Sequence, residues 1–244
     1  MHIKRSLGLT RGKNDKIDSR RIAEYAYRFY DKADIKGYCP SGIQRLRDLL
    51  TTRERLNKSL KSIIVSIKEL KRVDIEQAID LETYQLAAIR GIKESISEVE
   101  EAMFETIDRD SHLRQHCEMA TSIPGVGKIL AIKLIVYTQV FNRFESVRQL
   151  ACYSGVAPFE HRSGTSLNGK TGVSKFANMD LKSTLHLASL SAIQHNPDLK
   201  AYYHRKVSEG KSKMCVINAV RNKLLSRIIA VVNRQTPYVV LTQA

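Results

Sequence analysis

The feature that most constrains the fold is a pair of long, narrow apolar stripes in the middle of the chain. In the first, leucine and isoleucine recur at spacings of three and four, interrupted by Arg53 at a core position. Narrow stripes of this kind favour helices that pair with another helix over burial in a globular core. The sequence leaves open whether the partner lies within the chain or in another subunit. The stripes comprise Leu46, Leu49, Leu56, Leu60, Ile63, Ile67 and Leu70, then Leu86, Ile89, Ile92, Ile96, Val99, Met103 and Ile107.

The stretches on either side of the stripes are also mostly helical in pattern. Between the two stripes, a break near Val73 to Thr83 makes an antiparallel helical hairpin possible. The turn-rich GYCPSG separates this hairpin from an earlier helix. Strand signals are few, with a short strand possible near Thr171 to Ser174. We therefore predict a mainly α fold in three parts, 1–40, 41–118 and 119–244. The other expected helices are Asp15–Tyr30, Asp180–His195, Pro197–Ser208 and Met214–Arg234.

Charge is unevenly distributed along the 244 residues. The formal net charge is +15, with +5 in residues 1–36, −2 in residues 37–120 and +12 in residues 121–244. Because a polyanion releases counterions for every phosphate that is neutralised, this segregation favours a nucleic-acid partner. A membrane surface is the alternative, but no amphipathic basic helix stands out.

Cysteine usage and hydropathy indicate a cytoplasmic protein. The four cysteines are far apart without a C-x-x-C pair, so neither a zinc site nor a disulfide framework is suggested. No stretch resembles a signal peptide, and no apolar run approaches the ~20 residues of a membrane-spanning helix.

Two carboxylates stand three residues apart near the start of the first expected helix, in GKNDKID. Asp15 and Asp18 would project from one helix face, about a turn apart, so both can reach one point. They are suited to a hard metal ion. They are equally suited to an N-terminal capping pair that offsets the helix dipole.

A second motif, SIPGVGKILAIKLI, has the form of a helix-hairpin-helix element. Gly125 and Gly127 permit a tight turn, and the following helix would present free backbone N–H groups to a phosphate. Lys128 and Lys133 would assist. The alternative is an ordinary glycine-containing turn between two helices.

The stretch YSGVAPFEHRSGTSLNGKTGVSK combines glycines, hydroxyl side chains and basic residues with little periodicity. A serine nucleophile needs an exposed hydroxyl, a proton acceptor and cations that hold phosphate oxygens. Ser163 has cations near it in the sequence, namely Arg162, Lys170 and Lys175. Alternatively, the serines of this stretch only cap and solvate a loop. His186, His195 and His204 recur at spacings of nine, which is not a metal-ligand spacing, so we interpret them as packing or surface residues.

The chain resembles insertion-sequence transposases of the one-ten family, the DEDD type. The similarity follows the order of GKNDKIDSRRIA, the heptad helices, IPGVGKILA, YSGVAPFEHRSG and KFANMDLKSTLHLAS. It implies an N-terminal RuvC-like nuclease domain, a coiled-coil insertion and a C-terminal transposase domain with a serine. It also implies a DNA transposase or recombinase that cuts and rejoins donor and target DNA, guided by a structured RNA.

The resemblance assigns roles to individual residues. Asp15 and Asp18 correspond to the last two carboxylates of a four-carboxylate magnesium site, and Ser163 to the nucleophile, with Ser154 the less favoured candidate. Composite sites between the subunits of a homo-oligomer are implied, with the coiled coil as the means of self-association. Phosphate contacts are expected at Gly125, Gly127, Lys128, Arg162, Lys170 and Lys175.

One departure from the family qualifies these expectations. The family's first Asp and its Glu lie upstream of GKNDKID, and this sequence begins a few residues before that motif. We therefore predict an N-terminally truncated transposase that retains a helical remnant of the RuvC-like domain, with Mg²⁺ expected only if the missing carboxylates are supplied. The competing interpretation is a non-catalytic, oligomeric DNA- or RNA-binding protein.

Overall fold

The protein is mainly α-helical in the computed structural model, which describes residues 14–32, 41–163, 167–174 and 176–239. This confirms the predicted fold class. The chain divides into two compact units, residues 1–39 and residues 40–244.

The first unit contains helix α2 (Asp15–Arg28), followed by the single turn η1 (Tyr30–Lys32). The Asn14 side chain begins α2 by accepting a hydrogen bond from the Lys16 N–H. Asp15 and Asp18 occupy the first turn, where acidic side chains offset the helix dipole. The helix predicted at Asp15–Tyr30 is thus confirmed, with its end two residues earlier.

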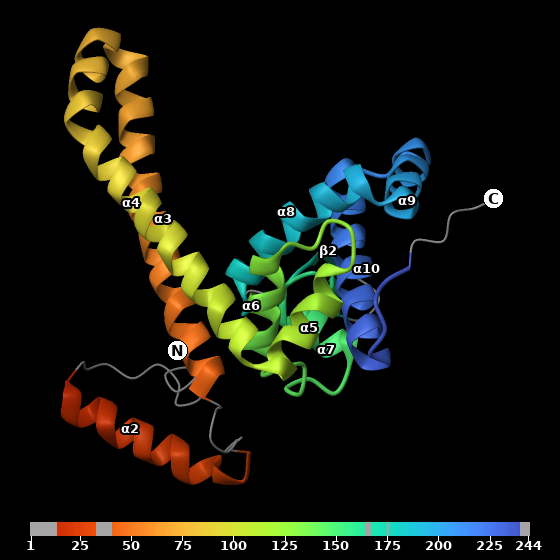
Figure 1. Cartoon of the computed structure of the whole chain (residues 1–244). Coiled ribbons are helices and arrows are strands. Elements are labelled where there is room, and N and C mark those ends of the chain that lie inside the picture. Colours follow the sequence, from red (N-terminus) through yellow and green to blue (C-terminus); the bar gives the residue numbers. More distant parts are fainter. Residues whose placement is uncertain (1–13, 33–40, 164–166, 175, 240–244) are drawn as a thin grey trace. The chain divides into compact units, whose positions relative to one another are not determined.

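Two long helices open the second unit and lie side by side as an antiparallel hairpin (Figure 1). They are α3 (Ser41–Val73) and α4 (Ile75–Arg109). Only Asp74 separates them, and its side chain caps α4 by accepting from the Gln77 N–H. The break is therefore much shorter than the eleven-residue stretch that the sequence suggested, and the helices pair within the chain.

The interface of this hairpin follows the predicted stripe of α3 closely. Every apolar position predicted for α3 is buried or half-buried, and Arg53 is half-buried because its Nε donates to Glu100 on α4 at 2.6 Å. On α4 one prediction is wrong. Leu86 is 49% exposed, whereas the neighbouring Gln85 turns toward α3, because the inward face passes through Ala78, Gln85 and Ile89.

The remaining helices form a compact bundle at the base of the hairpin (Figure 1). At its centre lies α6 (Lys128–Thr138), which packs against α3, α5 and α8 and buries residues on every face. Helix α10 packs against α5, α7, α8 and α9. None of the helices in the described ranges is long and apolar enough to cross a membrane. The other elements are α5 (Ser111–Thr121), α7 (Val147–Tyr153), α8 (Met179–His195), α9 (Pro197–Ser208) and α10 (Lys213–Arg234).

A two-stranded antiparallel hairpin stands between α7 and α8 in the sequence. Strand β1 (Phe159–Ser163) pairs with β2 (Leu167–Gly172), and a register shift occurs between Phe159 and His161. The strand expected near Thr171 to Ser174 thus exists, but it lies a few residues earlier. Its partner strand was not anticipated, because β1 has the sequence FEHRS, in which a single apolar residue is followed by four polar ones and no alternation appears.

Candidate nucleic-acid interface and serine hairpin

The predicted nucleophile, Ser163, is the last residue of β1 and pairs with Leu167, the first residue of β2. Arg162 precedes it in the same strand, opposite Asn168, and Lys170 belongs to β2. The backbone therefore brings three of the predicted residues onto one hairpin. We call this pair of strands, β1 and β2, the serine hairpin. Lys175 lies outside the described residues.

The two ends of this hairpin are fixed to each other and to the helical bundle. The Tyr153 carbonyl accepts from the Asn178 N–H at 2.7 Å, and the Asn178 side chain donates to the Tyr153 hydroxyl at 3.0 Å. Gly155 has a φ of +64°, and a Cβ there would lie 2.7 Å from that of Ala177. Only glycine fits this close approach without strain, so the strands leave the bundle from one narrow base.

Ser154, the other serine considered as a nucleophile, is fully buried in that base. Its hydroxyl donates to the Leu150 carbonyl at 2.7 Å, one helical turn back. The Ser154 hydroxyl therefore stabilises the end of α7, and it is not accessible to the phosphorus atom of a DNA strand.

The glycine turn lies between helices α5 and α6, in the order expected for the predicted helix-hairpin-helix element. Gly125 has a φ of +96°, and a Cβ there would come within 2.6 Å of the Ala192 backbone on α8. Gly125 is thus explained by conformation and packing. Gly127, in contrast, borders open space and begins α6 without a side-chain cap, so the first N–H groups of that helix remain available. The exposed Lys128 lies beside them, with its Nζ 4.7 Å from the centre of the Phe104 ring.

Lys133 is not the phosphate-binding residue that the sequence suggested. Its side chain is only 4% exposed, and its Nζ donates to Asp180 at 2.5 Å and to Thr184 at 3.0 Å. Because α6 is buried on every face, a lysine in its middle turn points into the bundle. Glu54 on α3 lies 4.0 Å away and completes a buried ionic cluster.

Tyr137 ties this cluster together by donating to Asp180 at 2.9 Å and approaching Glu54 at 3.4 Å. Burial alone would raise the pKa of Asp180, but the hydrogen bond and charge of Lys133 outweigh it and hold that pKa below its usual value. Burial, then the neighbouring Asp180, raise the pKa of Glu54. Burial and Asp180 likewise raise the pKa of the Tyr137 hydroxyl. The cluster joins α3, α6 and α8 at the base of the serine hairpin, and no local spacing in the sequence revealed it.

Asp15 and Asp18 lie on the exposed first turn of α2, as the i and i+3 spacing predicted. Asp18 also forms an ion pair with Arg21 at 3.3 Å. Their oxygens suit a hard cation such as Mg²⁺, which prefers octahedral oxygen ligands. Across the described ranges, however, no three His, Cys, Asp or Glu side chains gather into a group that could hold a metal ion. Two carboxylates provide an incomplete set of ligands.

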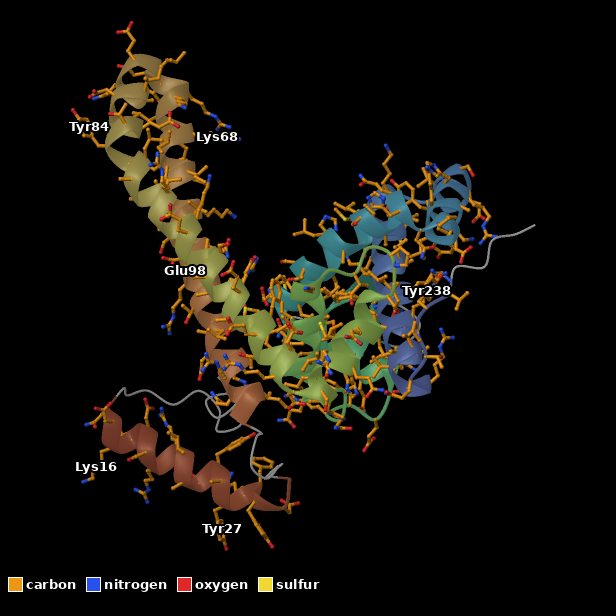
Figure 2. The ribbon with its side chains drawn as sticks, in the orientation of Figure 1. Lys16, Tyr27, Lys68, Tyr84, Glu98 and Tyr238 are labelled. Atoms are coloured by element: carbon orange, nitrogen blue, oxygen red, sulfur yellow. The ribbon has the colours of Figure 1, made fainter. Side chains whose placement is uncertain are left out.

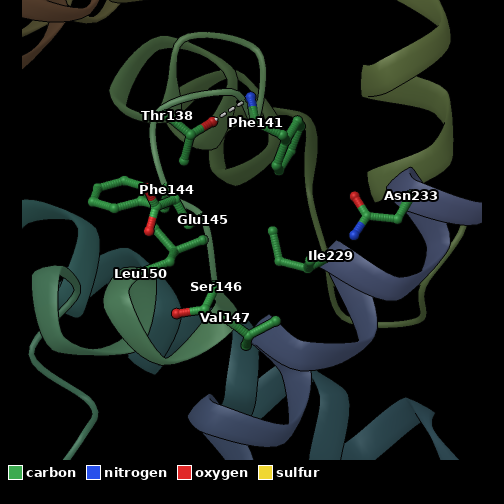
Figure 3. A pocket seen from close by; sticks show the side chains of 9 residues that line it. All are labelled: Thr138, Phe141, Phe144, Glu145, Ser146, Val147, Leu150, Ile229 and Asn233. Carbon is green, nitrogen blue, oxygen red and sulfur yellow. Dashed lines mark hydrogen bonds between the residues drawn. The ribbon is translucent and has the colours of Figure 1, made fainter.

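A cavity of about 210 Å³ lies between the α6–α7 connection and α10 (Figure 3). Its wall includes Phe141, the last of three consecutive non-glycine residues with positive φ, 51° to 63°. The Thr138 hydroxyl holds this left-handed turn by accepting from the Phe141 N–H at 2.8 Å. Apolar side chains, three uncharged polar ones and the Glu145 carboxylate line the cavity, and no lysine or arginine is among the described lining residues, so it is unsuited to a phosphate.

Comparison with known proteins relates the chain to transposases. Residues 117–204 match the family described as Transposase IS116/IS110/IS902. Over these residues the chain is similar to this transposase family. The match spans the glycine turn, the serine hairpin and α8, and similarity to transposases indicates DNA as a partner.

Individual relatives extend the similarity across almost the whole chain. The "Pilin gene-inverting protein" of Moraxella lacunata is 28% identical over 240 residues, covering 96% of this chain and 70% of that protein. The "Transposase for insertion sequence element IS1111A" of Coxiella burnetii is 27% identical, covering 93% of this chain and 68% of that protein. A 43.6 kDa protein of insertion element IS110 from Streptomyces coelicolor is 30% identical over 118 residues, 48% of this chain and 29% of the relative.

Proposed function

We propose that this transposase cuts and rejoins DNA strands through Ser163, which forms a covalent link to one strand end. The observation that carries the proposal is the serine hairpin, in which Ser163 ends a strand beside Arg162 and is anchored at a narrow base. The burial and internal hydrogen bond of Ser154 favour Ser163 over its competitor. Two relatives are named as a transposase and a gene-inverting protein, and both names agree with strand exchange.

The proposed step exchanges one phosphate ester for another. The Ser163 oxygen attacks the phosphorus atom and loses its proton, and the bond from phosphorus to one sugar oxygen breaks. That sugar oxygen leaves with a proton as a free hydroxyl. Rejoining is the reverse attack by a hydroxyl of the new partner strand, so the number of phosphodiester bonds is conserved. Arg162 and Lys170 would hold the phosphate oxygens as negative charge develops.

Asp15 and Asp18 would contribute two of the carboxylates of a Mg²⁺ site. When bound, the metal would polarise the scissile phosphate. The remaining ligands would come from further carboxylates, water and DNA phosphates. In this proposal, the chain forms the active site together with a RuvC-like portion that carries those further carboxylates.

We also propose a guide RNA and a homo-oligomer as parts of the active assembly. The net charge of +12 in residues 121–244 supports binding of polyanions, with log affinity falling steeply as log salt rises. The distal half of the α3–α4 hairpin supports self-association, since several of its bulky apolar residues are exposed, and Figure 2 shows Tyr84 among them. They include Ile75, Ile79, Tyr84 and Leu86, which are 49% to 75% exposed.

The decisive experiment is a denaturing gel of labelled donor DNA incubated with protein, Mg²⁺ and guide RNA. We expect a protein–DNA adduct when the RuvC-like portion is supplied, and its loss in Ser163→Ala, Asp15→Ala and Asp18→Ala. Ser154→Ala is the matched control and should retain the adduct. An adduct that survives Ser163→Ala but not Ser154→Ala would overturn the assignment of the nucleophile.

The second candidate function is a non-catalytic, oligomeric DNA- or RNA-binding protein. The incomplete carboxylate set of the described residues favours it. In that case no adduct forms under any condition, while salt-sensitive binding and self-association remain. Leu86→Glu and Ile79→Glu should then abolish self-association in sedimentation experiments without affecting nucleic-acid affinity per chain.

A further inference from the structure

A buried arginine without a carboxylate partner lies between α8 and α10. Arg221 is only 7% exposed, and its guanidinium donates to His186 Nδ1 at 2.6 Å and to the Asn218 side-chain oxygen at 3.3 Å. Its Nε is buried and has no hydrogen-bond partner. No acidic side chain pairs with it in the described part of the chain. Burying a charge that no opposite charge compensates is costly, so an arginine in this setting needs an explanation.

The contact with Arg221 fixes the protonation of His186. A guanidinium has donors only, so the His186 Nδ1 must accept, and the hydrogen of the neutral ring must lie on Nε2. The positive charge of Arg221 behind the ring opposes a second proton, and burial followed by that charge lowers the pKa of His186. His186 is half-buried, so the opposite edge of its ring can present a fixed N–H donor at the surface.

This donor lies beside the base of the serine hairpin. Lys182 precedes His186 by one helical turn on α8, and its side chain approaches Gly155, where a Cβ would be 3.3 Å from the Lys182 Cδ. On α10, the Asn218 amide donates to the Val156 carbonyl at 2.9 Å, two residues before Pro158 and the start of β1. Lys182 makes no ion pair in the described part of the chain. Lys182, and Arg221 with the His186 N–H donor, therefore lie on the two helices that contact this end of the hairpin, and among the described residues no carboxylate pairs with either cation.

We propose that Lys182 and His186, supported by Arg221, form a binding site for one backbone phosphate of the DNA strand that lies on the serine hairpin. Lys182 supplies a charged donor, and His186 supplies the Nε2–H donor. Arg221 is a positioning residue, which holds the tautomer and adds positive potential from behind. The site deepens the proposed function and rests on it, because it assumes that DNA engages the hairpin.

The direct test observes His186 by long-range ¹H–¹⁵N spectra of histidine-labelled protein, in a Ser163→Ala background that excludes covalent chemistry. We expect the Nε2–H tautomer at neutral pH in the free protein. Short duplex DNA should then shift the His186 signals and leave those of His204, an exposed histidine on α9, unchanged. A His186 that carries its hydrogen on Nδ1, or one that DNA does not perturb, would overturn the proposal. A shift that structured RNA produces and DNA does not would also overturn it.

Affinity measurements with four variants separate the charged from the neutral donor. Lys182→Met should weaken DNA binding and reduce the slope of log affinity against log salt by about 1. His186→Phe should weaken binding about tenfold and leave this slope unchanged, since a neutral donor releases no counterion. His186→Gln should restore part of the loss, and His204→Phe should have no effect. Equal losses in His186→Phe and His204→Phe would refute a specific site.

The results also distinguish this site from the proposed chemistry. If Ser163→Ala abolishes the adduct and His186→Phe binds DNA normally, the phosphate site is wrong and the nucleophile stands. If no adduct forms but DNA shifts the His186 signals, the phosphate site stands and the catalytic proposal fails.

Discussion

Two buried cations in the same helical bundle have opposite surroundings. Lys133 on α6 contacts one carboxylate at 2.5 Å and has a second at 4.0 Å. Arg221 on α10 has no carboxylate contact in the described ranges, and a neutral histidine and an amide receive its hydrogen bonds. Both lie close to the base of the serine hairpin, one on the side of α3 and the other on the side of α10.

Lys133 therefore carries a charge that stabilises the bundle, whereas the charge of Arg221 can attract a ligand. The cluster around Lys133 satisfies its donors internally and connects three helices, so its contribution is to the stability of the bundle. The charge of Arg221 remains uncompensated, so its favourable electrostatic potential extends toward the surface through His186. The same residue chemistry, a cation in an α-helix, thus serves two purposes according to whether acidic side chains reach it.

The largest expected effect is on folding stability when the compensated cation is removed. Lys133→Met should reduce the free energy of unfolding by about 2 kcal/mol, because the half-buried carboxylates of Asp180 and Glu54 would be left without their cation. Chemical denaturation followed by circular dichroism measures this. Lys128→Met, which removes an exposed cation from the same helix, should change the stability by less than about 1 kcal/mol. Similar losses in the two variants would remove the contrast between the cations.

A smaller effect on stability is expected when the uncompensated cation is removed. Arg221→Met should leave the free energy of unfolding within about 1 kcal/mol of the parent, since methionine fills similar space without a buried charge. The same variant should weaken DNA binding severalfold. Arg227→Met is the control on α10, because Arg227 pairs with Asp198 at 3.5 Å and with Tyr238, away from the hairpin. A loss of stability in Arg221→Met as large as in Lys133→Met would show that Arg221 is structural.

The smallest effect concerns Glu54 and depends on pH. A raised pKa in the folded state means that Glu54 favours folding below about pH 4.3 and that this contribution is lost as pH rises through the folded-state value. Glu54→Gln should therefore become more stable relative to the parent as pH rises from 4 to 7, by less than about 1 kcal/mol.

Asp180→Asn should show the opposite dependence on pH. The lowered pKa of Asp180 stabilises the fold above about pH 3.9 and loses that contribution as pH falls through the folded-state value. Asp180→Asn should therefore be less stable than the parent at neutral pH, with the difference shrinking in acid. Parallel pH profiles of unfolding for the two variants would contradict the assignment of charge within the cluster.

Much of the fold was accessible from the sequence because helices depend on local periodicity. The stripe of α3 appears in the structure at the predicted positions, and α9 has the predicted bounds Pro197–Ser208. The failures are of another kind. Leu86 is exposed and Gln85 is half-buried because the packing of α4 on α3 determines which face of α4 turns inward. Strand β1 was not predicted because its short and mostly polar sequence has no periodic pattern.

Some features of the candidate site were likewise predictable from local sequence, and others were not. Local sequence determined the order of the motifs, the pair Asp15 and Asp18 in a first helical turn, and the region that carries Ser163. Tertiary structure alone decided that Ser154 is buried, that Gly125 packs against α8, and that Lys133 faces two carboxylates. It also decided that His186, which spacing alone marked as unremarkable, receives a hydrogen bond from an arginine 35 positions away. The physical reason is that the pattern of a helix depends on residues three and four apart in the sequence, whereas the environment of a charge depends on residues that only tertiary packing brings together.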